Sequence, residues 1–440
     1  MGKKKTMLVG ALLTTATLAI AGCSGAGAPS TGTASAPADP SEASGTIKVL
    51  TQRTDLVKNG ELDAYAAEFN KIYPKVKVKF EGLTDYEGEV KIRMNTKNYG
   101  DVLMIPGAVS KNDYPTFFAP LGSSSVMSDK YRFSDKTTVA GKVYGVAQFG
   151  TVNGFVYNKA LWKKAGVTEW PTTPQEFLAG LRAIKSKTGA VPYYTNFKDG
   201  WPLVQWTGNI GSVSCDGSAT NTLAGASSPW NKGSELQVID TLLYDIVKNG
   251  LSEKDPNTTN WEASKAKVAK GEIGAMMLGS WSITQMQDAA KKAGGKADDI
   301  GYMPFPAQSD GKFCATVVSD YQQAVNIHSE HKEAARAWID WFTEKSGYSV
   351  KEGAVPTLKS ASMPATLDDL VDNDVIFVDR SERDTGTVND IDKGAEIGLN
   401  SPDYRQKLID IARGAQKGSL DSYFAELNKK WNEAAATVGS

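Results

Sequence analysis

The fold of this chain is decided by residues 46–80, which read TIKVLTQRTDLVKNGELDAYAAEFNKIYPKVKVKF. The segment opens with a β-rich run and, after Pro74, closes with a second one, residues 75–80. Between them we predict a helix over residues 61–73, because its apolar residues recur at the spacing of one helix face: Leu62, Tyr65, Ala66, Phe69 and Ile72. A strand, a helix and a second strand in this order predict a βαβ unit.

The same alternation continues along the chain. We predict further strands at residues 101–105, 273–278 and 300–303, and further helices at residues 161–165, 174–187, 232–249, 261–270, 334–342, 404–413 and 423–435. Thr173-Pro174-Gln175-Glu176 marks one helix start, with a hydroxyl at the N-cap, proline at the first helical position and glutamate at the third. The chain is therefore expected to be an α/β protein.

Size and charge limit the function classes. The chain has 440 residues, 41% of them hydrophobic and 22% charged, which predicts about two or three domains. It carries 49 lysines and arginines against 50 acids, a formal charge of -1. Such a balance lacks the basic field of nucleic-acid-binding proteins, so no nucleic-acid partner is expected.

Metal and thiol chemistry have little material here. The sequence has two histidines and three cysteines, and neither a Cys-x-x-Cys nor a His-Glu-x-x-His spacing. His328 and His331 stand beside Glu330, but no third ligand is evident and we interpret them as a solvated helix start. We expect no metal and no other cofactor.

The first residues indicate export. Lys3 to Lys5 precede an apolar run, residues 7–22, that is short for a membrane span and long enough for a signal peptide. Its end, Ile20-Ala21-Gly22-Cys23, resembles the bacterial lipoprotein signal, whose cysteine receives a lipid; an ordinary signal peptide with an incidental Cys23 is the alternative. Residues 24–44 are almost all Ser, Ala, Gly, Pro and Thr, a composition typical of flexible spacers. We predict a signal peptide over residues 1–22, a lipidated Cys23 with linker over residues 23–44, and anchoring to the outer face of the cell membrane.

Several motifs in order resemble one family. FNKIYPKVKV (69–78), GDVL (100–103), YGVA (144–147), YNK (157–159) and GEIGAMMLGSW (271–281) are similar to segments of the extracellular solute-binding proteins of sugar ABC importers, the maltose-binding-protein-like group. Residues 334–342 resemble the interlobe helix of these proteins. The resemblance covers the chain from Thr46 to its C-terminus.

The resemblance implies a two-lobe periplasmic-binding-protein-like fold of the type II kind, with ligand enclosed between the lobes. The chain would cross a hinge near Gly150, Asp320 and Gly353. The N-terminal lobe would comprise residues 46–150 plus 321–350, and the C-terminal lobe residues 151–320 plus 351–440.

A sugar offers hydroxyl groups and an apolar face of C–H bonds, so its site needs polar groups around aromatic rings. In α/β sheets the ligand lies beyond the carboxyl ends of the strands. Trp281, which follows a predicted strand and resembles the sugar-stacking Trp of the family, is the first candidate. The full candidate set is Trp281, Trp201, Asn196, Tyr194, Asp199, Gln52, Arg53, Gln148, Asn153, Asp320 and Tyr321. The alternatives are core burial of the rings, a solvated turn at Gln52 and Arg53, and a purely hinge-shaping role for the last four residues.

Cys215 and Cys314 remain after Cys23 is assigned to the anchor. Outside the membrane a disulfide between them is favoured, and closing a loop of about 100 residues stabilises a fold by up to about 4.7 kcal/mol in the entropic account. Two buried free thiols are the alternative.

These features predict a monomeric lipid-anchored receptor that captures an oligosaccharide and delivers it to the permease subunits of an ABC transporter. The alternative is an extracellular glycoside hydrolase or another carbohydrate-active lipoprotein. The sequence has no Gly-x-Ser-x-Gly elbow and no Gly-x-x-x-x-Gly-Lys phosphate loop, and its two histidines are too few for a convincing triad. No catalytic residue is therefore assigned, and no enzyme is expected.

Overall fold

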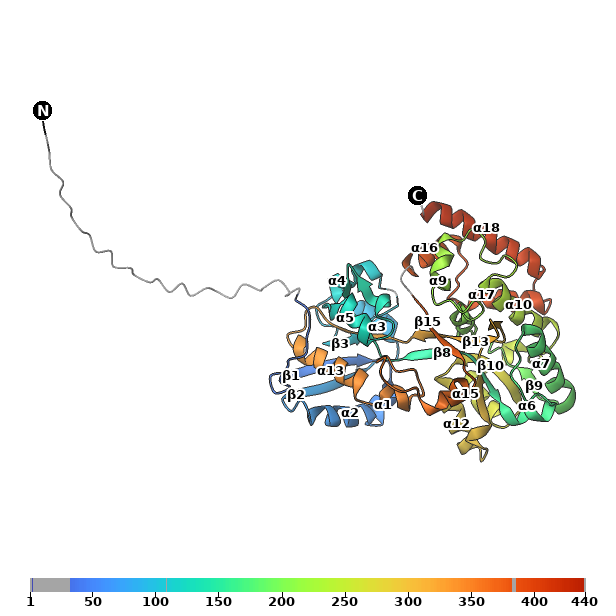
Figure 1. The fold of residues 1–440 in the computed structure, drawn as a ribbon, viewed down its shortest axis with the longest axis horizontal. Coiled ribbons are helices and arrows are strands. Elements are labelled where there is room, and N and C mark those ends of the chain that lie inside the picture. The colour runs from blue at the N-terminus through green and yellow to red at the C-terminus, as the bar shows by residue number, and fades with distance from the viewer. Residues whose placement is uncertain (1, 3–31, 108, 382–384, 439–440) are drawn as a thin grey trace. The chain divides into compact units, whose positions relative to one another are not determined.

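Two separate sheets contain most of the strands of the computed structural model (Figure 1). The structure describes residues 2, 32–107, 109–381 and 385–438, so Cys23, nearly all of the predicted signal peptide and the first part of the linker lie outside the described residues. Both sheets belong to one unit of the chain, Thr31–Ser440.

The first sheet has five strands, in the order β2 (Val76–Gly82), β1 (Gly45–Thr51), β3 (Val102–Met104), β14 (Gln322–Val325) and β7 (Val146–Ala147). β1 is parallel to β2 and to β3, whereas β14 is antiparallel to β3 and β7. Helix α2 (Glu61–Asn70) connects the parallel pair β1 and β2. The βαβ unit predicted over residues 46–80 is therefore confirmed.

Helix α2 is shorter than predicted. It ends at Asn70, and Ile72, which was assigned to its buried face, is 38% exposed. The cause is Pro74, which disfavours helical backbone at the residue before it and leaves no room for another turn.

The remaining elements around the first sheet are α1 (Thr54–Lys58), α3 (Tyr86–Arg93), α4 (Tyr114–Phe117), α5 (Ser124–Lys130), α13 (Lys332–Glu344), α14 (Tyr348–Lys351) and a small sheet of β4 (Gly122–Ser123), β6 (Lys142–Val143) and β5 (Thr138–Val139). Trp338 and Phe342 of α13 pack in one core with Ile47 and Phe69. Helix α13 thus covers the first sheet, as Figure 1 shows in orange against the blue strands, and the prediction of an interlobe helix was wrong.

The second sheet is built around the long buried strand β8 (Gly150–Asn158). β8 is antiparallel to β10 (Ile273–Gly279), to β11 (Ile300–Met303) and to β13 (Lys312–Ser319). β9 (Val191–Tyr193) and β15 (Ile376–Asp379) extend the sheet in parallel with β10 and β13, and β12 (Gln308–Ser309) forms a hairpin with β13.

Most of the other helices surround this second sheet (Figure 1). They are α6 (Lys159–Ala165), α7 (Pro174–Thr188), α8 (Trp201–Val204), α9 (Ala219–Thr222), α10 (Glu235–Lys248), α11 (Trp261–Ala269), α12 (Ser282–Lys292), α15 (Asp368–Asp372), α16 (Thr385–Ala395), α17 (Pro402–Ala412) and α18 (Leu420–Val438). The predicted cap of α7 is present, since the Thr173 hydroxyl accepts from Glu176 N at 3.2 Å. The Glu176 carboxylate in turn accepts from Thr172 rather than from Thr173.

The chain passes between the two sheets at three places that lie side by side. Asp320 N donates to Phe149 O at 2.9 Å, which joins the β7–β8 connection to the β13–β14 connection. Gly150 and Val355 exchange both backbone hydrogen bonds, at 2.7 and 2.8 Å, which adds the third connection. The three connections therefore form one hydrogen-bonded ribbon between the sheets.

A disulfide joins Cys215 to Cys314, with the two Cα atoms 5.3 Å apart. Cys314 lies in β13 and is fully buried, whereas Cys215 lies in the loop before α9. The bond ties this loop to the second sheet.

Candidate functional site

A cleft of about 730 Å³ lies between the two sheets, beside the ribbon of connections. Elements of the first sheet, the connections and elements of the second sheet all contribute to its walls. Its lining residues are Gln52, Arg53, Asp55, Leu56, Glu61, Phe149, Thr151, Gln205, Trp281, Thr284, Gln285, Asp288, Val318, Ser319, Asp320, Tyr348, Lys351 and Glu352.

One wall of the cleft is a single face of α12. Trp281 stands at the N-cap position, and Thr284, Gln285 and Asp288 follow at intervals of three, four and seven residues. These intervals place all four side chains on one side of a helix. Trp281 was predicted because it follows β10; the polar residues behind it were not, although their spacing is visible in the sequence.

Trp281 belongs to a cluster of three indole rings. Its centroid lies 5.8 Å from that of Trp201 and 5.8 Å from that of Trp261, and the latter two are 5.1 Å apart. Each of these tryptophans stands at the start of a helix, α8, α11 or α12. Only Trp281 is among the cleft-lining residues, so Trp201 and Trp261 support its ring.

The Trp281 ring lies close over the end of β10. A Cβ atom added to Gly279 would come within 2.5 Å of the indole Nε1 and within 2.9 Å of Thr151 Cγ2. Real Cβ atoms do not approach so closely, so only glycine at position 279 leaves the indole in this place.

Three other predicted residues, Tyr194, Asn196 and Asp199, lie behind the indoles. Asp199 accepts from Trp261 N at 2.9 Å, and the Tyr194 hydroxyl accepts from Asn260 N at 3.0 Å. Asn196 is 1% exposed, with its amide nitrogen 3.3 Å from Met276 Sδ. None of the predicted residues Tyr194, Asn196 and Asp199 lines the cleft. They hold the loops from which Trp201 and Trp261 start.

Gln52 and Arg53 line the cleft on the opposite side, directly after β1. The Arg53 guanidinium donates to Asp55 at 2.9 and 2.8 Å, to the Tyr348 hydroxyl at 3.0 Å and to Glu352 at 2.9 Å. This guanidinium holds the pKa of the Asp55 carboxyl below its usual range. Arg53 thus binds α14 to the first sheet and has few donors left for a ligand.

Asp320 lies on the connections and lines the cleft. Burial raises the pKa of its carboxyl, the neighbouring Glu352 raises it further, and a hydrogen bond from Tyr321 N together with Lys136 and Arg53 opposes the shift. Beside it, the Thr151 hydroxyl is buried without a hydrogen-bond partner in the protein. A carboxylate acceptor and an unpaired hydroxyl at one place suit a ligand that carries hydroxyl groups.

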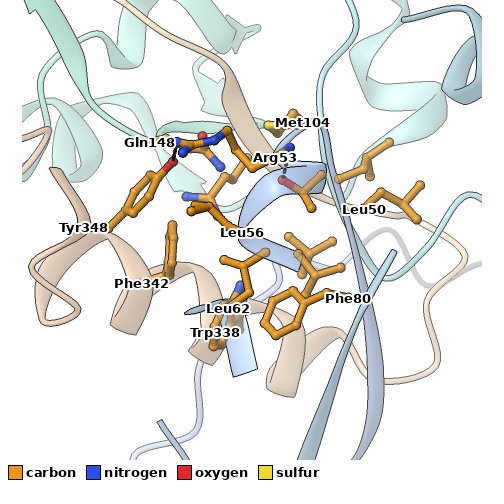
Figure 2. A pocket seen from close by; sticks show the side chains of 15 residues that line it. Leu50, Arg53, Leu56, Leu62, Phe80, Met104, Gln148, Trp338, Phe342 and Tyr348 are labelled. Atoms are coloured by element: carbon orange, nitrogen blue, oxygen red, sulfur yellow. Dashed lines mark hydrogen bonds between the residues drawn. The ribbon is translucent and has the colours of Figure 1, made fainter. Parts of the chain in front are cut away.

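Gln148 lines a second, smaller cavity of about 20 Å³ inside the first-sheet core (Figure 2). Figure 2 shows Arg53, Gln148 and Tyr348 together above the apolar side chains of Leu56 and Trp338. The volume holds about one water molecule, so this cavity is not a ligand site. The Gln148 carbonyl oxygen is buried and has no protein partner.

Two further predicted residues lie outside the cleft lining. Asn153 is 2% exposed in β8, where its amide donates to Thr316 O at 3.3 Å. Tyr321 packs its ring against Tyr86, with centroids 6.0 Å apart. The Asn153 side chain belongs to the packing of the second sheet, and the Tyr321 ring packs against the core of the first.

The charges of the cleft are largely paired within the protein. Asp55 and Glu352 bind Arg53, and Glu61 binds Lys351. Amides, hydroxyls and aromatic rings make up most of the remaining lining. Such a surface suits a neutral ligand with hydroxyl groups and an apolar face, rather than an ion that needs an opposite charge.

Within the ranges described above, no cluster of three or more His, Cys, Asp and Glu side chains is arranged to bind a metal ion. Among the helices of the same ranges, none combines the length and the apolar character needed to cross a bilayer.

Residues 54–348 match the family model for bacterial extracellular solute-binding proteins. The chain belongs to this family. The match begins at Thr54, the residue after Arg53, and ends at Tyr348, the first residue of α14. It includes all three tryptophans of the indole cluster. The predicted family is therefore confirmed.

Solved structures of family members support the fold. A manno-oligosaccharide-specific solute-binding protein of Bifidobacterium animalis subsp. lactis, in complex with mannotriose, is 34% identical with a TM-score of 0.81, and the match covers 90% of this chain and 96% of that one. A second ABC-transporter binding protein of the same organism, in complex with mannobiose, is 33% identical with a TM-score of 0.81, over 91% and 96% of the two chains. The predicted α/β fold of periplasmic binding proteins is confirmed.

A curated relative is more distant. The multiple sugar-binding protein of Streptococcus mutans is 24% identical over 309 residues, which are 68% of this chain and 71% of the relative.

Proposed function

We propose that this chain is a receptor for a neutral oligosaccharide, which it binds between its two sheets. The observation that carries the proposal is the cleft itself, with the Trp281 ring on one wall and amide, hydroxyl and carboxylate groups around it. Sugar rings stack on indole faces through their C–H bonds and donate their hydroxyls to such polar groups.

Manno-oligosaccharides are the first ligands to test. The two Bifidobacterium proteins bind mannotriose and mannobiose, and each is about one third identical to this chain over nearly its whole length. Mannose units are uncharged, which agrees with a cleft whose arginine and lysine are already paired with carboxylates.

The receptor would act at the outer face of the cell membrane, anchored through Cys23, and would pass its ligand to the permease subunits of an ABC transporter. Ligand contacts on both walls of the cleft would favour a closed form, since a ligand shifts an equilibrium by its differential affinity for the two states. We propose that the receptor is monomeric and turns over no substrate.

Calorimetric titration of the purified chain with mannobiose and mannotriose tests the binding function. Saturable heats with intact sugar recovered afterwards would support a receptor, whereas released mannose would favour the alternative glycoside hydrolase. Absence of binding by these and other neutral oligosaccharides would refute the proposal.

The anchor is tested separately. Expressed with its own leader, the chain is expected in the membrane fraction, and Cys23→Ala is expected in the soluble fraction. Retention of the Cys23→Ala variant on membranes would exclude this residue as the anchor.

A further inference from the structure

A second groove lies on the first-sheet side, next to the cleft. Its volume is about 660 Å³, close to that of the cleft. We call it the α2–α14 groove; it is lined by Glu61, Ala64, Tyr65, Glu68, Lys71, Ile72, Trp341, Lys345, Ser346 and Lys351.

The groove and the cleft share two residues. Glu61 and Lys351 line both, and their side chains form an ion pair that runs from the start of α2 to the end of α14. Lys351 keeps 56% of its side chain exposed within this pair. The Glu61–Lys351 pair therefore lies on the boundary between the cleft and the groove.

Aromatic rings continue from one hollow into the other. Tyr348 lines the cleft and Tyr65 lines the groove, and the two rings meet edge to face with centroids 6.0 Å apart. Burial, aided by the nearby carboxylates of Glu61 and Glu352, raises the pKa of Tyr65 to about 12, so its hydroxyl keeps its proton at physiological pH.

The groove has the mixed lining that suits a sugar. Ile72, 38% exposed, supplies apolar surface beside Tyr65, and Glu68 and Lys71 are paired with each other at 2.6 Å. Four of the five charged side chains that line the groove, all except Lys345, are paired within the protein. Rings and alkyl groups beside such pairs favour a neutral, hydroxylated ligand over an ionic one.

We propose that the α2–α14 groove binds the distal units of a longer oligosaccharide whose first units occupy the cleft. This inference rests on the proposed function and deepens it, because it makes chain length a property that the receptor recognises. The Glu61–Lys351 pair is the point at which the glycan passes from the cleft into the groove.

Two matched substitutions on α2 test this assignment. Ala64 is exposed and lines the groove, and Ala67 is exposed on the same helix but does not line it. Ala64→Arg places a long side chain into the groove, while Ala67→Arg adds the same charge to the same helix at a position that does not line the groove. Equal melting temperatures of the two variants verify that neither disturbs the fold.

The measurement is calorimetric affinity for manno-oligosaccharides of two to six units. For the wild type and Ala67→Arg, affinity is expected to keep rising for chains longer than the cleft holds. For Ala64→Arg this gain is expected to disappear, a loss of about tenfold for the longest chains and none for mannobiose.

The groove assignment would be overturned, with the receptor function intact, if wild-type affinity did not increase with oligosaccharide length beyond the shortest chains that bind. It would also be overturned if Ala64→Arg and Ala67→Arg had equal affinities at every oligosaccharide length. Loss of transport with unchanged affinities in Ala64→Arg would instead mark the groove as a protein-docking face, and would also overturn the assignment. Failure of the wild type to bind any chain would refute the receptor function, and with it this inference.

Discussion

Replacing Trp281 by alanine is expected to weaken oligosaccharide binding by about 1 to 3 kcal/mol, the range measured when aromatic platforms are truncated at binding sites. Because about 1.4 kcal/mol corresponds to a tenfold change, the dissociation constant should rise by about 5- to 150-fold. The structure supports this range, since the ring lines the cleft and two other indoles hold it in place.

The same substitution also costs stability, which must be kept apart from affinity. The substitution removes the two ring contacts of Trp281, with Trp201 and Trp261, and each such contact contributes about 0.5 to 1.5 kcal/mol to the free energy of unfolding. Trp261→Ala is the matched control, because Trp261 also makes two contacts within the cluster but does not line the cleft. It should lower the melting temperature and change the affinity much less.

Isothermal titration with the best manno-oligosaccharide, well below the melting temperature of each variant, measures both affinities. Binding by Trp281→Ala within about twofold of the wild type would refute a stacking role for this ring. Equal weakening of binding by Trp261→Ala and Trp281→Ala would also refute it, because the indole cluster would then act only through the fold.

Three other predictions concern the cleft and the disulfide. Gly279→Ala should reduce affinity in titration calorimetry while Trp281 is retained, because the added methyl group displaces the indole; unchanged affinity would contradict this placement. Burial raises the pKa of Asp320, so affinity should fall, by up to about tenfold per pH unit, as acidification protonates this acceptor. Asp320→Asn should abolish that dependence, and a fall that persists in this variant would assign it to another group. Replacing Cys215 and Cys314 by serine should lower the free energy of unfolding by up to about 4.7 kcal/mol, since the bond closes a loop with a sequence separation of 99; equal denaturation midpoints with and without the bond would refute this.

The sequence predicted those parts of the site that follow directly from the ends of strands. Arg53 comes two residues after β1 and Trp281 comes two residues after β10, and both line the cleft. The order of hydrophobic runs identifies such strands, and ligands of α/β proteins lie beyond the strand ends. The predicted helices and strands were located for the same reason, with errors of a few residues at their ends.

Other site residues depend on contacts that no local pattern contains. Tyr348 and Glu352 reach the cleft because Arg53 holds α14 against the first sheet, and these residues are nearly 300 positions apart in the chain. Asn153 was selected because it flanks the predicted hinge crossing near Gly150, and Asn196 as an amide near a strand end. Both are buried, because β8 is covered on both faces and residue 196 turns into the core behind the indoles. Trp261 was missed, although it starts a helix just as Trp201 and Trp281 do.

The ribbon of connections has a mechanical consequence. Two residues separate β7 from β8, two separate β13 from β14, and Gly353 with Ala354 separates Glu352, which Arg53 holds, from Val355, which pairs with Gly150. Short chain segments that are hydrogen-bonded side by side resist sliding past one another within their common plane, and they bend more easily out of that plane. We therefore expect the two sheets to move relative to each other mainly by rotation about one axis, which would bring the walls of the cleft together in a single register.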